Sequence, residues 1–538
     1  MVYLPEPGTD IVSVVRSNHI ESPTKPAPPP PPRISGKVVE LDELPELLAP
    51  LRLDCKRIAL CHGVFDLLHV GHIRHLAEAK TCAEILVVTV TGDRYVNKGP
   101  HRPAFSETLR CEALAALHVV DFVAINRDPL AVTAIDAVRP DVYVKGPDYA
   151  NSDDDNTGNI VREAEAVAIW GGTIQFTKGE IFSSSHLLNR HMYTYAPLVE
   201  QYLEDFRSRH SIRDVTDALK SLRDLRVLVV GEAILDEYVY CDQLGKSSKE
   251  PVLAMRYKSK EVHAGGSLAV ANHLADFCGS VELVTYLGER DGHEELVRSL
   301  LLPNVQVRIV YKTNSPTIVK RRYVESDLFS KLFEAYVIND ELLEPAVDHI
   351  LCQLLDSRVG DSDVVVVADF GHGLITNSAV DLLTAKSPFL AVNTQSNAAN
   401  IGFHTISKYA RADYICIHEG EVRLDARSRR GPLMELVNVL RARLQCDNVL
   451  VTQGKWGCSL FSGDVSIRSP ALASNVVDRT GSGDAVLAVT SVLVANGVNP
   501  EVTAFIANLV GAQKVMIFGN RASIGRIATI KFAESLLK

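Results

Sequence analysis

The stretch that decides the fold of the first half of the chain reads, from residue 60 to residue 72, Leu-Cys-His-Gly-Val-Phe-Asp-Leu-Leu-His-Val-Gly-His. An apolar, β-prone run leads into a small-residue turn at Gly63, and a helix-like apolar pattern begins at Ile73. The stretch therefore predicts a strand, a tight turn and the N-terminus of a helix. Such a terminus attracts phosphate, because its free N–H groups and its dipole favour an anion.

Two histidines stand at this predicted helix N-terminus. His69 and His72 are three residues apart, and Gly71 between them lets a nucleotide approach the backbone. Imidazolium groups at this place would stabilise the charge that builds on a phosphoryl group during its transfer. The pair alone is equally compatible with two hydrogen-bonded or zinc-binding histidines, so the longer motif has to decide.

The longer motif, residues 63–72, resembles the signature of the cytidylyltransferase-like nucleotidyltransferases. These are α/β enzymes that join a nucleoside triphosphate to a phosphate ester and release pyrophosphate. The resemblance implies that His69 and His72 stabilise the transition state. It also implies nucleotide contacts by three further residues of the motif, which are Gly63, Phe65 and Gly71.

Composition sets limits on the class of protein. A chain of 538 residues suggests about two to four domains, and 46% hydrophobic and 23% charged residues are ordinary for a globular protein. The net charge of −10 argues against a general nucleic-acid-binding surface. Ten cysteines without a Cys-x-x-Cys pair fit a reduced compartment, and neither a membrane span nor a signal peptide is visible. We therefore expect a cytoplasmic protein without a nucleic-acid or membrane partner.

The chain divides into four segments. Residues 1–36 hold a proline-rich run and are expected to form a disordered tail. Residues 37–190 and 224–538 each alternate strand-like and helix-like runs, which predicts two α/β domains, the first with a doubly wound parallel sheet. Residues 191–223 are rich in helix formers and are expected to form a helical linker, whose apolar face packs on a domain or forms a dimer contact.

The predicted elements follow this alternation. In the first domain the expected strands are 57–61, 85–91, 119–125 and 141–145, and the expected helices are 41–53, 73–80, 106–117 and 130–138. In the second domain the expected strands are 226–230, 282–286, 364–369, 389–393, 414–418 and 448–452, with a basic, β-like run at 317–324.

Polar residues follow the predicted strands of the first domain, where a doubly wound sheet binds its ligand. Asp93 ends the second strand, Lys98 lies in the next loop, and Arg110 lies on the next helix. Lys145 and Asp148 end the fourth strand. Lysine and arginine suit a triphosphate, because they bring positive charge and several N–H donors. Each residue taken alone is equally well explained as a solvated surface charge.

The order of these residues resembles one branch of the family. That branch is the nucleotidyltransferase half of the bifunctional heptose-7-phosphate kinase/heptose-1-phosphate nucleotidyltransferases, over roughly residues 56–190. The family's Ser-Thr-Thr near the end appears here as Ser-Ser-Ser at residues 183–185. The resemblance implies that Lys98 assists catalysis. It also implies nucleotide contacts by Arg110, Ser183 and Ser184, and substrate contacts by Asp93, Lys145 and Asp148.

The second half carries its own phosphate motif. Residues 478–484 read Asp-Arg-Thr-Gly-Ser-Gly-Asp, and an apolar helix pattern follows. Phosphoryl transfer from ATP needs an anion cradle and a base for the attacking hydroxyl. Gly481 and Gly483 would free backbone N–H groups for the cradle, and Asp484 stands where a base is needed. Asp484 alone is also compatible with an ordinary helix cap.

This string resembles a signature of the ribokinase-like (PfkB) sugar kinases, over roughly residues 224–538. The resemblance implies an α/β domain with a small β lid and Asp484 as the base. It implies sugar contacts by Asp236, Gly265 and Gly266, nucleotide contacts by Gly454, Gly457, Gly481 and Gly483, and a family motif around Asp369. In two departures, Ala269 replaces the family's Asn, and the magnesium-linked Asn-x-x-Glu appears as His418-x-x-Glu421.

Both halves resemble one bifunctional family, although the transferase comes first here and second in the familiar fusion. The predicted function is therefore a sugar-phosphate kinase and sugar-1-phosphate nucleotidyltransferase that makes an ADP-heptose-like product. It would use Mg²⁺ and ATP, or CTP in the transferase half, and would need a separate phosphatase between the two steps. The oligomeric state, including a homo-oligomer, stays open. The alternatives are a transferase with a degenerate regulatory or sugar-binding kinase fold, and an aminoacyl-tRNA synthetase-like protein.

Overall fold

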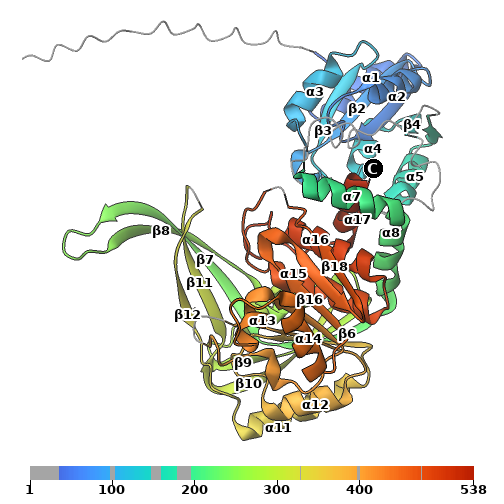
Figure 1. Cartoon of the computed structure of the whole chain (residues 1–538). Helices are drawn as coiled ribbons and strands as arrows, with labels where there is room; N and C mark the ends of the chain where they lie inside the picture. The colour runs from blue at the N-terminus through green and yellow to red at the C-terminus, as the bar shows by residue number, and fades with distance from the viewer. Residues whose placement is uncertain are drawn as a thin grey trace, which may run out of the picture.

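The computed structural model describes residues 36–96, 103–146, 159–177, 195–327, 329–396, 400–473 and 475–537. They form two α/β units, with α7 (Pro197–Arg209) and α17 (Arg526–Leu537) between them (Figure 1). No helix in this part of the chain is long and apolar enough to cross a membrane. All ten cysteines are free thiols. The predicted tail, except for Gly36, lies outside the described residues.

The first unit is a five-stranded parallel sheet in the order β3-β2-β1-β4-β5. Alternate strand residues feed two separate apolar clusters, one under α2 and α3 and the other under α1, α4 and α5. A sheet covered on both faces explains the near-continuous apolar runs of its strands. The strands are β1 (Ile58–Gly63), β2 (Ile85–Thr91), β3 (Phe122–Asn126), β4 (Val142–Lys145) and β5 (Thr173–Phe176). The helices are α1 (Leu44–Leu53), α2 (Val70–Lys80), α3 (Glu107–Ala115), α4 (Val132–Val138) and α5 (Asn159–Ile169).

The second unit is built on a nine-stranded sheet in the order β10-β9-β6-β13-β14-β15-β16-β17-β18. Its strands are parallel up to β16, and β17 and β18 are antiparallel. The strands are β6 (Arg226–Gly231), β9 (Ser280–Arg290), β10 (Val305–Pro316), β13 (Val364–Asp369), β14 (Leu390–Thr394), β15 (Tyr414–His418), β16 (Asn448–Thr452), β17 (Cys458–Ser462) and β18 (Val465–Ser469). Besides α17, its helices are α9 (Ser267–Ala275), α10 (Glu294–Leu300), α11 (Pro345–Val359), α12 (Asn377–Lys386), α13 (Glu419–Asp425), α14 (Leu433–Arg443), α15 (Ser482–Ala495) and α16 (Pro500–Lys514).

The helices that follow the first unit pack on the second. α7 and α8 (Ile212–Lys220) contribute their apolar faces to the large core of the second unit. Phe206 is buried and stacks on Phe505 of α16, with 4.2 Å between the ring centroids. Arg207 donates a hydrogen bond to the carbonyl of Leu536 at 2.6 Å. The amphipathic face of this segment is therefore covered by the second unit itself.

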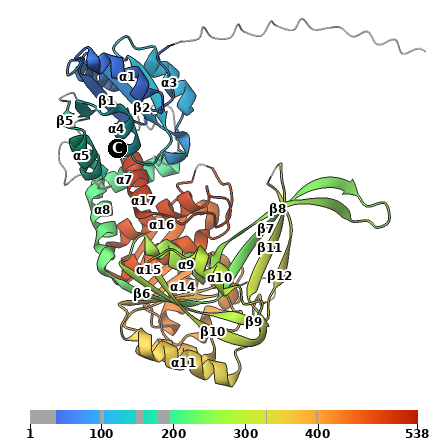
Figure 2. The same ribbon diagram turned by 180° about the vertical axis from the view of Figure 1, so that it is seen from behind.

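A four-stranded lid stands apart from the body, and its long hairpin projects away from it (Figures 1 and 2). Its order is β12-β11-β7-β8, formed by β7 (Ala233–Lys246), β8 (Leu253–Gly266), β11 (Ile318–Glu325) and β12 (Lys331–Val337). The sequence pattern predicted β11 but not β7, β8 or β12. Most of β8 and all of β12 are exposed or half-exposed, so their residues lack the apolar alternation that marks a half-buried strand.

Candidate active sites

The first site begins where β1 ends. β1 stops at Gly63, and α2 begins at Val70, three residues earlier than the apolar pattern predicts. The helix starts early because His69 caps it: the Nδ1 atom of His69 accepts a hydrogen bond from the backbone N–H of Gly71 at 3.1 Å. The site lies at the point where the strand order reverses, between β1 and β4, which is where an open α/β sheet binds its ligand.

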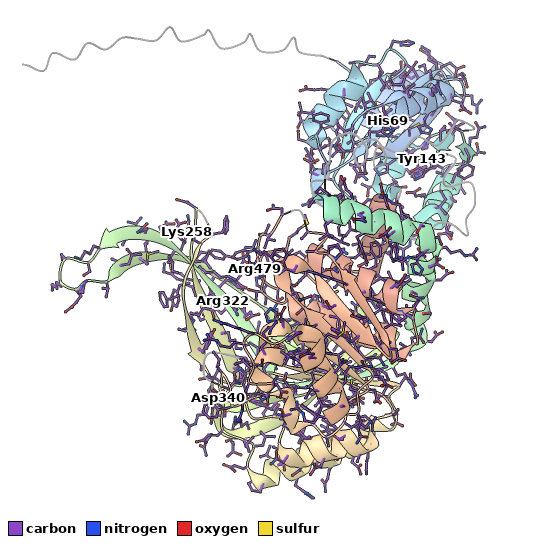
Figure 3. The ribbon with its side chains drawn as sticks, viewed as in Figure 1. His69, Tyr143, Lys258, Arg322, Asp340 and Arg479 are labelled. Carbon is purple, nitrogen blue, oxygen red and sulfur yellow. The ribbon has the colours of Figure 1, made fainter. Side chains whose placement is uncertain are left out.

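The turn that joins β1 to α2 is strained and presents two imidazoles together. Phe65 and Leu67 have left-handed backbone conformations, with φ of 51° and 49°, and such a conformation costs a non-glycine residue about 1 kcal/mol or more. The rings of His69 and His72 lie 4.0 Å apart between centroids, and Phe65 meets the ring of His72 edge-on at 5.5 Å. Figure 3 labels His69 within the first unit. The structure thus brings both predicted catalytic histidines to one helix N-terminus.

Arg110 lies on the predicted helix and is anchored by protein groups around the site. Its side chain is buried, and its guanidinium donates to the carboxylate of Asp93 at 2.6 Å. It also donates to three backbone carbonyls around the site, those of Val64, Thr91 and Phe105. Because these protein groups surround the guanidinium, Arg110 holds the motif loop in place, and its nucleotide contact stays a prediction. The sequence could not show this anchoring, since burial of a single arginine leaves no local pattern.

The end of β4 carries a buried ion pair. Lys145 lies 2.7 Å from the carboxylate of Glu163, and Tyr143 donates its hydroxyl to the same carboxylate at 3.3 Å. Burial lowers the pKa of His62 to about 3, and the charge of Lys145 adds to this effect. His62 shares a hydrogen bond with Thr89 at 2.9 Å, so this histidine is a neutral part of the sheet. Lys98, Asp148, Ser183 and Ser184 lie outside the described residues and stay predictions.

The second site is built around the start of α15. Gly481 precedes the helix in a left-handed conformation with φ of 74°, and a Cβ atom there would overlap the side chain of Asn520. A Cβ atom on Gly483 would meet nothing within 4 Å, so this part of the helix N-terminus faces open space. Asp484 lies in the first turn and is buried. The three residues therefore have the placement expected for an anion cradle with a neighbouring base.

A second carboxylate faces this one from the lid. Asp236 on β7 is buried and forms an ion pair with Arg322 on β11 at 2.5 Å. Asn520 donates to the other oxygen of Asp236 at 2.8 Å. A Cβ atom on Gly265 would lie 2.5 Å from the carboxylate, so only glycine fits there. Burial first, and the charge of Asp236 next, raise the pKa of Asp484 to about 6. In Figure 3, Arg322 lies on the lid.

The lid is also tied to the loop before α15. Lys331 on β12 lies 2.7 Å from the carboxylate of Asp478 and donates to the hydroxyl of Thr480 at 2.8 Å. Asp478 accepts further hydrogen bonds from the backbone N–H groups of Thr480 at 3.1 Å and Gly519 at 3.0 Å. Burial acts to raise the pKa of Asp478, but these hydrogen bonds outweigh it and the pKa lies below its usual value. Asp478 therefore organises the anion loop as a carboxylate.

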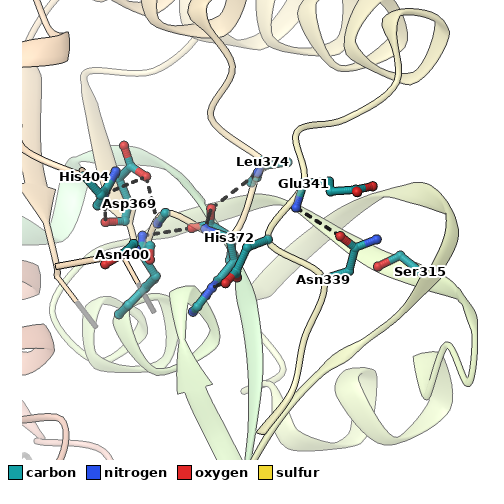
Figure 4. Close-up of polar contacts among 12 residues, drawn as sticks. Ser315, Asn339, Glu341, Asp369, His372, Leu374, Asn400 and His404 are labelled. Carbon is teal, nitrogen blue, oxygen red and sulfur yellow. Dashed lines mark hydrogen bonds and ion pairs between the residues drawn. The ribbon is translucent and has the colours of Figure 1, made fainter. Parts of the chain in front are cut away.

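Sequence reasoning missed Glu232, which holds the loop that follows β13. Its carboxylate is buried after β6 and accepts hydrogen bonds from three backbone N–H groups, those of Phe370, His372 and Leu374. Figure 4 labels two of these donor residues, His372 and Leu374, beside Asp369. Asp369, at the end of β13, is likewise held by protein groups, since Tyr409 donates to it at 2.7 Å and Lys408 pairs with it at 2.5 Å. The signal that could have revealed Glu232 is a carboxylate inside an otherwise apolar run.

Residues 224–524 match the family model described as "pfkB family carbohydrate kinase". The chain belongs to the pfkB family of carbohydrate kinases. Residues 60–190 match a second model, described as "Cytidylyltransferase-like". The two matches cover the second and the first α/β unit.

Several curated relatives carry the name "Bifunctional protein HldE". The one from Koribacter versatilis is 41% identical over 162 residues, which are 30% of this chain and 32% of the relative. The one from Shewanella piezotolerans is 27% identical over 322 residues, which are 59% of this chain and 65% of the relative. The chain thus spans between about a third and two thirds of these relatives. Escherichia coli phosphofructokinase-2 in complex with potassium is 15% identical, with a TM-score of 0.49, over 58% of this chain and 100% of that one.

Two positions depart from the pfkB pattern, and the structure gives one of them a physical account. The Nδ1 atom of His418 accepts a hydrogen bond from the backbone N–H of Gly420 at 3.0 Å and caps α13. Histidine thus supplies the acceptor that an asparagine cap would supply. Ala269 is buried inside α9 and brings no polar group to the site.

Glu421 fits a magnesium site in its chemistry. Its carboxylate accepts backbone hydrogen bonds from Ser396 at 2.9 Å and His418 at 3.1 Å. Burial raises its pKa to about 7, and the nearby charge of Asp484 adds to the rise. The described residues contain no group of three or more histidine, cysteine, aspartate or glutamate side chains placed to hold a metal. Mg²⁺ commonly uses one or two carboxylates together with nucleotide phosphates and water, and Glu421 matches that donor set.

The remaining predicted glycines serve different purposes. Gly454 has a left-handed φ of 56° and open space around it, as a nucleotide contact requires. Gly457 and Gly266 have φ values of 90° and 57°, and a Cβ atom on either would overlap backbone atoms of a neighbouring segment. These two glycines therefore permit close packing of the chain, whatever they contact in a ligand complex.

Proposed function

We propose that the chain is a bifunctional enzyme that makes a nucleoside diphosphate sugar of the ADP-heptose type. Its second unit would phosphorylate the anomeric hydroxyl of a sugar phosphate, and its first unit would join a sugar 1-phosphate to a nucleotide. A separate phosphatase would act between these steps. The two family matches and the name of the relatives support both activities. The observation that carries the proposal is Asp484, an ionisable buried base beside an open helix N-terminus.

In the kinase step, Asp484 would take the proton of the attacking sugar hydroxyl. Its pKa of about 6 leaves it mostly ionised at neutral pH and still basic enough to accept a proton. Asp236 would accept hydrogen bonds from sugar hydroxyls, and the N–H groups from Gly481 to Gly483 would stabilise the transferred phosphoryl group. Mg²⁺ held by Glu421 and the nucleotide would neutralise phosphate charge.

In the transferase step, the phosphate of the sugar 1-phosphate would attack the α-phosphate of ATP or CTP directly, and pyrophosphate would leave as the bond between the α- and β-phosphates breaks. No side-chain nucleophile is needed, because the substrate supplies it. Backbone N–H groups at the N-terminus of α2 that the His69 cap does not use would bind the phosphates, and His72, whose ring lies beside that of His69, would stabilise the developing charge. Positioning and charge stabilisation would thus supply the rate enhancement.

One observation favours the alternative in which only the transferase works. The carboxylate of Asp236, the predicted sugar ligand, is occupied by Arg322 and Asn520. A kinase fold that binds or senses a sugar without phosphorylating it would be compatible with this arrangement and with Ala269. The synthetase-like alternative loses support, because residues 60–190 match the cytidylyltransferase-like model.

Phosphorus NMR would test the proposal on the full chain. The protein is incubated with Mg-ATP and a panel of heptose and hexose phosphates, and separately with a nucleoside triphosphate and a sugar 1-phosphate. We expect a new anomeric phosphate in the first reaction, lost in Asp484→Asn and kept in Asp447→Asn, whose side chain is 89% exposed. We expect pyrophosphate in the second reaction, lost in His69→Ala. Pyrophosphate alone, with no phosphorylation across the panel, would establish the alternative.

A further inference from the structure

Two lysines among the described residues of the second unit are buried, and the ammonium group of each is hydrogen-bonded to backbone carbonyls. Lys312 donates to the carbonyl of Asn339 at 2.6 Å, and Lys514 donates to the carbonyls of Thr480 at 3.0 Å and Gly519 at 2.6 Å. These two ammonium groups replace their hydration with backbone oxygens, so they have structural roles. Both therefore show what a satisfied buried lysine looks like in this fold.

Lys320 does not follow that pattern. It lies on β11 and is half-buried, and its ammonium makes no hydrogen bond or ion pair with any described residue. Its ammonium instead lies over the rings of Tyr336, at 5.6 Å from the centroid, and Phe370, at 5.8 Å. Aromatic faces attract a cation but accept none of its three N–H donors in full. This lysine is therefore held in a partly dehydrated place with its donors unused.

The position of Lys320 is in the kinase site. It pairs with Asp236 across the β7–β11 register and shares a strand face with Arg322, two residues on. The pKa of Lys320 lies below its usual value, chiefly because partial burial disfavours the charged form, and the charge of Arg322 adds to this effect. Three carboxylates oppose the shift without cancelling it, those of Asp236, Asp484 and Glu232. No described carboxylate oxygen lies within 4.0 Å of its nitrogen, the limit for an ion pair. The ammonium thus shares its surroundings with the sugar-side carboxylate and the base without being paired to either.

An ammonium that is partly removed from water and has no hydrogen-bond partner is costly, and an anionic ligand that accepts its hydrogen bonds removes the cost. Arg322, by contrast, is already engaged by Asp236 at 2.5 Å and Glu334 at 3.2 Å. Of these two described lid cations, Lys320 is the one whose donors remain for a ligand.

We propose that Lys320 binds a phosphate oxygen of the substrates in the kinase site. The inference rests on the proposed kinase function and assigns a residue that the motifs did not single out. The oxygen belongs either to the phosphate that the acceptor sugar already carries or to the γ-phosphoryl group of ATP. In both cases the contact stabilises the binding of a ligand that brings negative charge under the lid.

Kinetics of Lys320→Met in the full chain test the assignment. Methionine keeps the length of the side chain and removes its charge. Lys260→Met is the matched control, because Lys260 lies on the outer face of the lid and pairs with Glu237 at 3.2 Å. The substrates are Mg-ATP with heptose 7-phosphate and, in parallel, the same heptose without its phosphate. Loss of a charge-assisted hydrogen bond corresponds to roughly a 10- to 100-fold effect.

The two sources of the phosphate oxygen give different results. If Lys320 binds the acceptor's phosphate, KM for heptose 7-phosphate rises by that factor and the preference over the unphosphorylated heptose falls equally. If it binds the γ-phosphoryl group, kcat falls by that factor with both acceptors. Lys320→Arg should recover part of either loss. Values of KM and kcat equal to those of Lys260→Met would overturn the proposal. A pH–rate profile that changes only at acid pH, with KM and kcat at neutral pH unchanged, would overturn it as well.

Binding measurements separate failure of this inference from failure of the proposed function. A wild-type chain that turns over none of the acceptors would refute the kinase activity itself. In that case, calorimetry with heptose 7-phosphate and with a non-hydrolysable ATP analogue still tests Lys320. If Lys320→Met binds either ligand about 10-fold or more weakly than the wild type does, the phosphate contact is supported. If the variant and the wild type bind each ligand with equal affinity, the contact is excluded.

Discussion

Replacing Asp484 by asparagine should abolish the kinase and at the same time stabilise the fold. Asp484 is buried at the first turn of α15, and its carboxylate faces Asp236. Asparagine has nearly the same shape but carries no charge, so it removes the cost of burying a carboxylate close to another one. Loss of the base removes the acceptor for the sugar hydroxyl proton.

The size of the gain follows from the pKa. Burial and Asp236 raise the pKa of Asp484 from 3.8 to about 6, and two units correspond to about 3 kcal/mol. A carboxyl whose pKa is raised by folding contributes its stability below pH 3.8, and this contribution is lost as the pH rises through 6. The asparagine of the variant cannot ionise, so the variant does not lose this stability as the pH rises. Lys514 loses a favourable charge in the variant, so we expect a net gain of about 1–3 kcal/mol at pH 8 and close to zero at pH 4.

Urea denaturation followed by tryptophan fluorescence measures this gain. The chain has two tryptophans, Trp170 in the first unit and Trp456 in the second, so the background Trp170→Phe reports on the second unit alone. Asp478→Asn is the matched control with the opposite sign. Asp478 is ionised and paired with Lys331, so its neutralisation should destabilise the same loop by about 1–3 kcal/mol at pH 8.

Two results would refute this reasoning. A loss of stability in Asp484→Asn at pH 8 would show that the carboxylate is a net stabilising group, as Asp478 is. A gain of equal size at pH 4 and pH 8 would show that the effect comes from shape or packing and not from ionisation. Retained phosphorylation in Asp484→Asn would separately refute its role as the base.

Three further predictions concern the two sites. His69→Ala and His72→Ala should each lower pyrophosphate release about 100-fold or more and leave sugar phosphorylation unchanged, since the two units have separate cores. Arg110→Met should lower the free energy of unfolding of the first unit by about 1–3 kcal/mol, measured by the fluorescence of Trp170, because the backbone carbonyls of Val64, Thr91 and Phe105 lose their donor. The kinase kcat/KM should fall about tenfold per pH unit below pH 6, as the free enzyme's Asp484 becomes protonated, and a pH–rate profile checks this.

The fold was predictable wherever burial leaves a pattern. The strand expected at 85–91 coincides with β2, and the strands expected at 364–369, 414–418 and 448–452 coincide with β13, β15 and β16. These strands are covered on both faces, so their sequences are runs of β-branched and apolar residues. The lid strands β7, β8 and β12 escaped prediction. Exposure removes the need for an apolar side in β8 and β12, whereas the first nine residues of β7 are buried and their apolar run is interrupted by Asp236 and Glu237.

The candidate sites divide in the same way. Residues that form a local motif, such as His69, His72 and Asp484, could be found because a helix N-terminus is itself a local feature. Residues that act across long sequence distances could not be found. Glu232 contacts a loop about 140 residues away, and the anchoring role of the buried Arg110 is visible only when its partners are known. Spacing in the sequence carries no information about such contacts.

The lid contacts predict that closure of the lid and assembly of the candidate kinase site occur together. Asp236 and Lys331 belong to the lid, whereas Asn520 and Asp478, which they bind, belong to the body. Opening the lid would separate both pairs together, and it would also move Asp236 away from Asp484. The pKa of Asp484 would then fall, since one cause of its rise is the charge of Asp236. The base should therefore be strongest only in the closed state, when the sugar is held and water is excluded, and ATP hydrolysis without a sugar should be correspondingly slow.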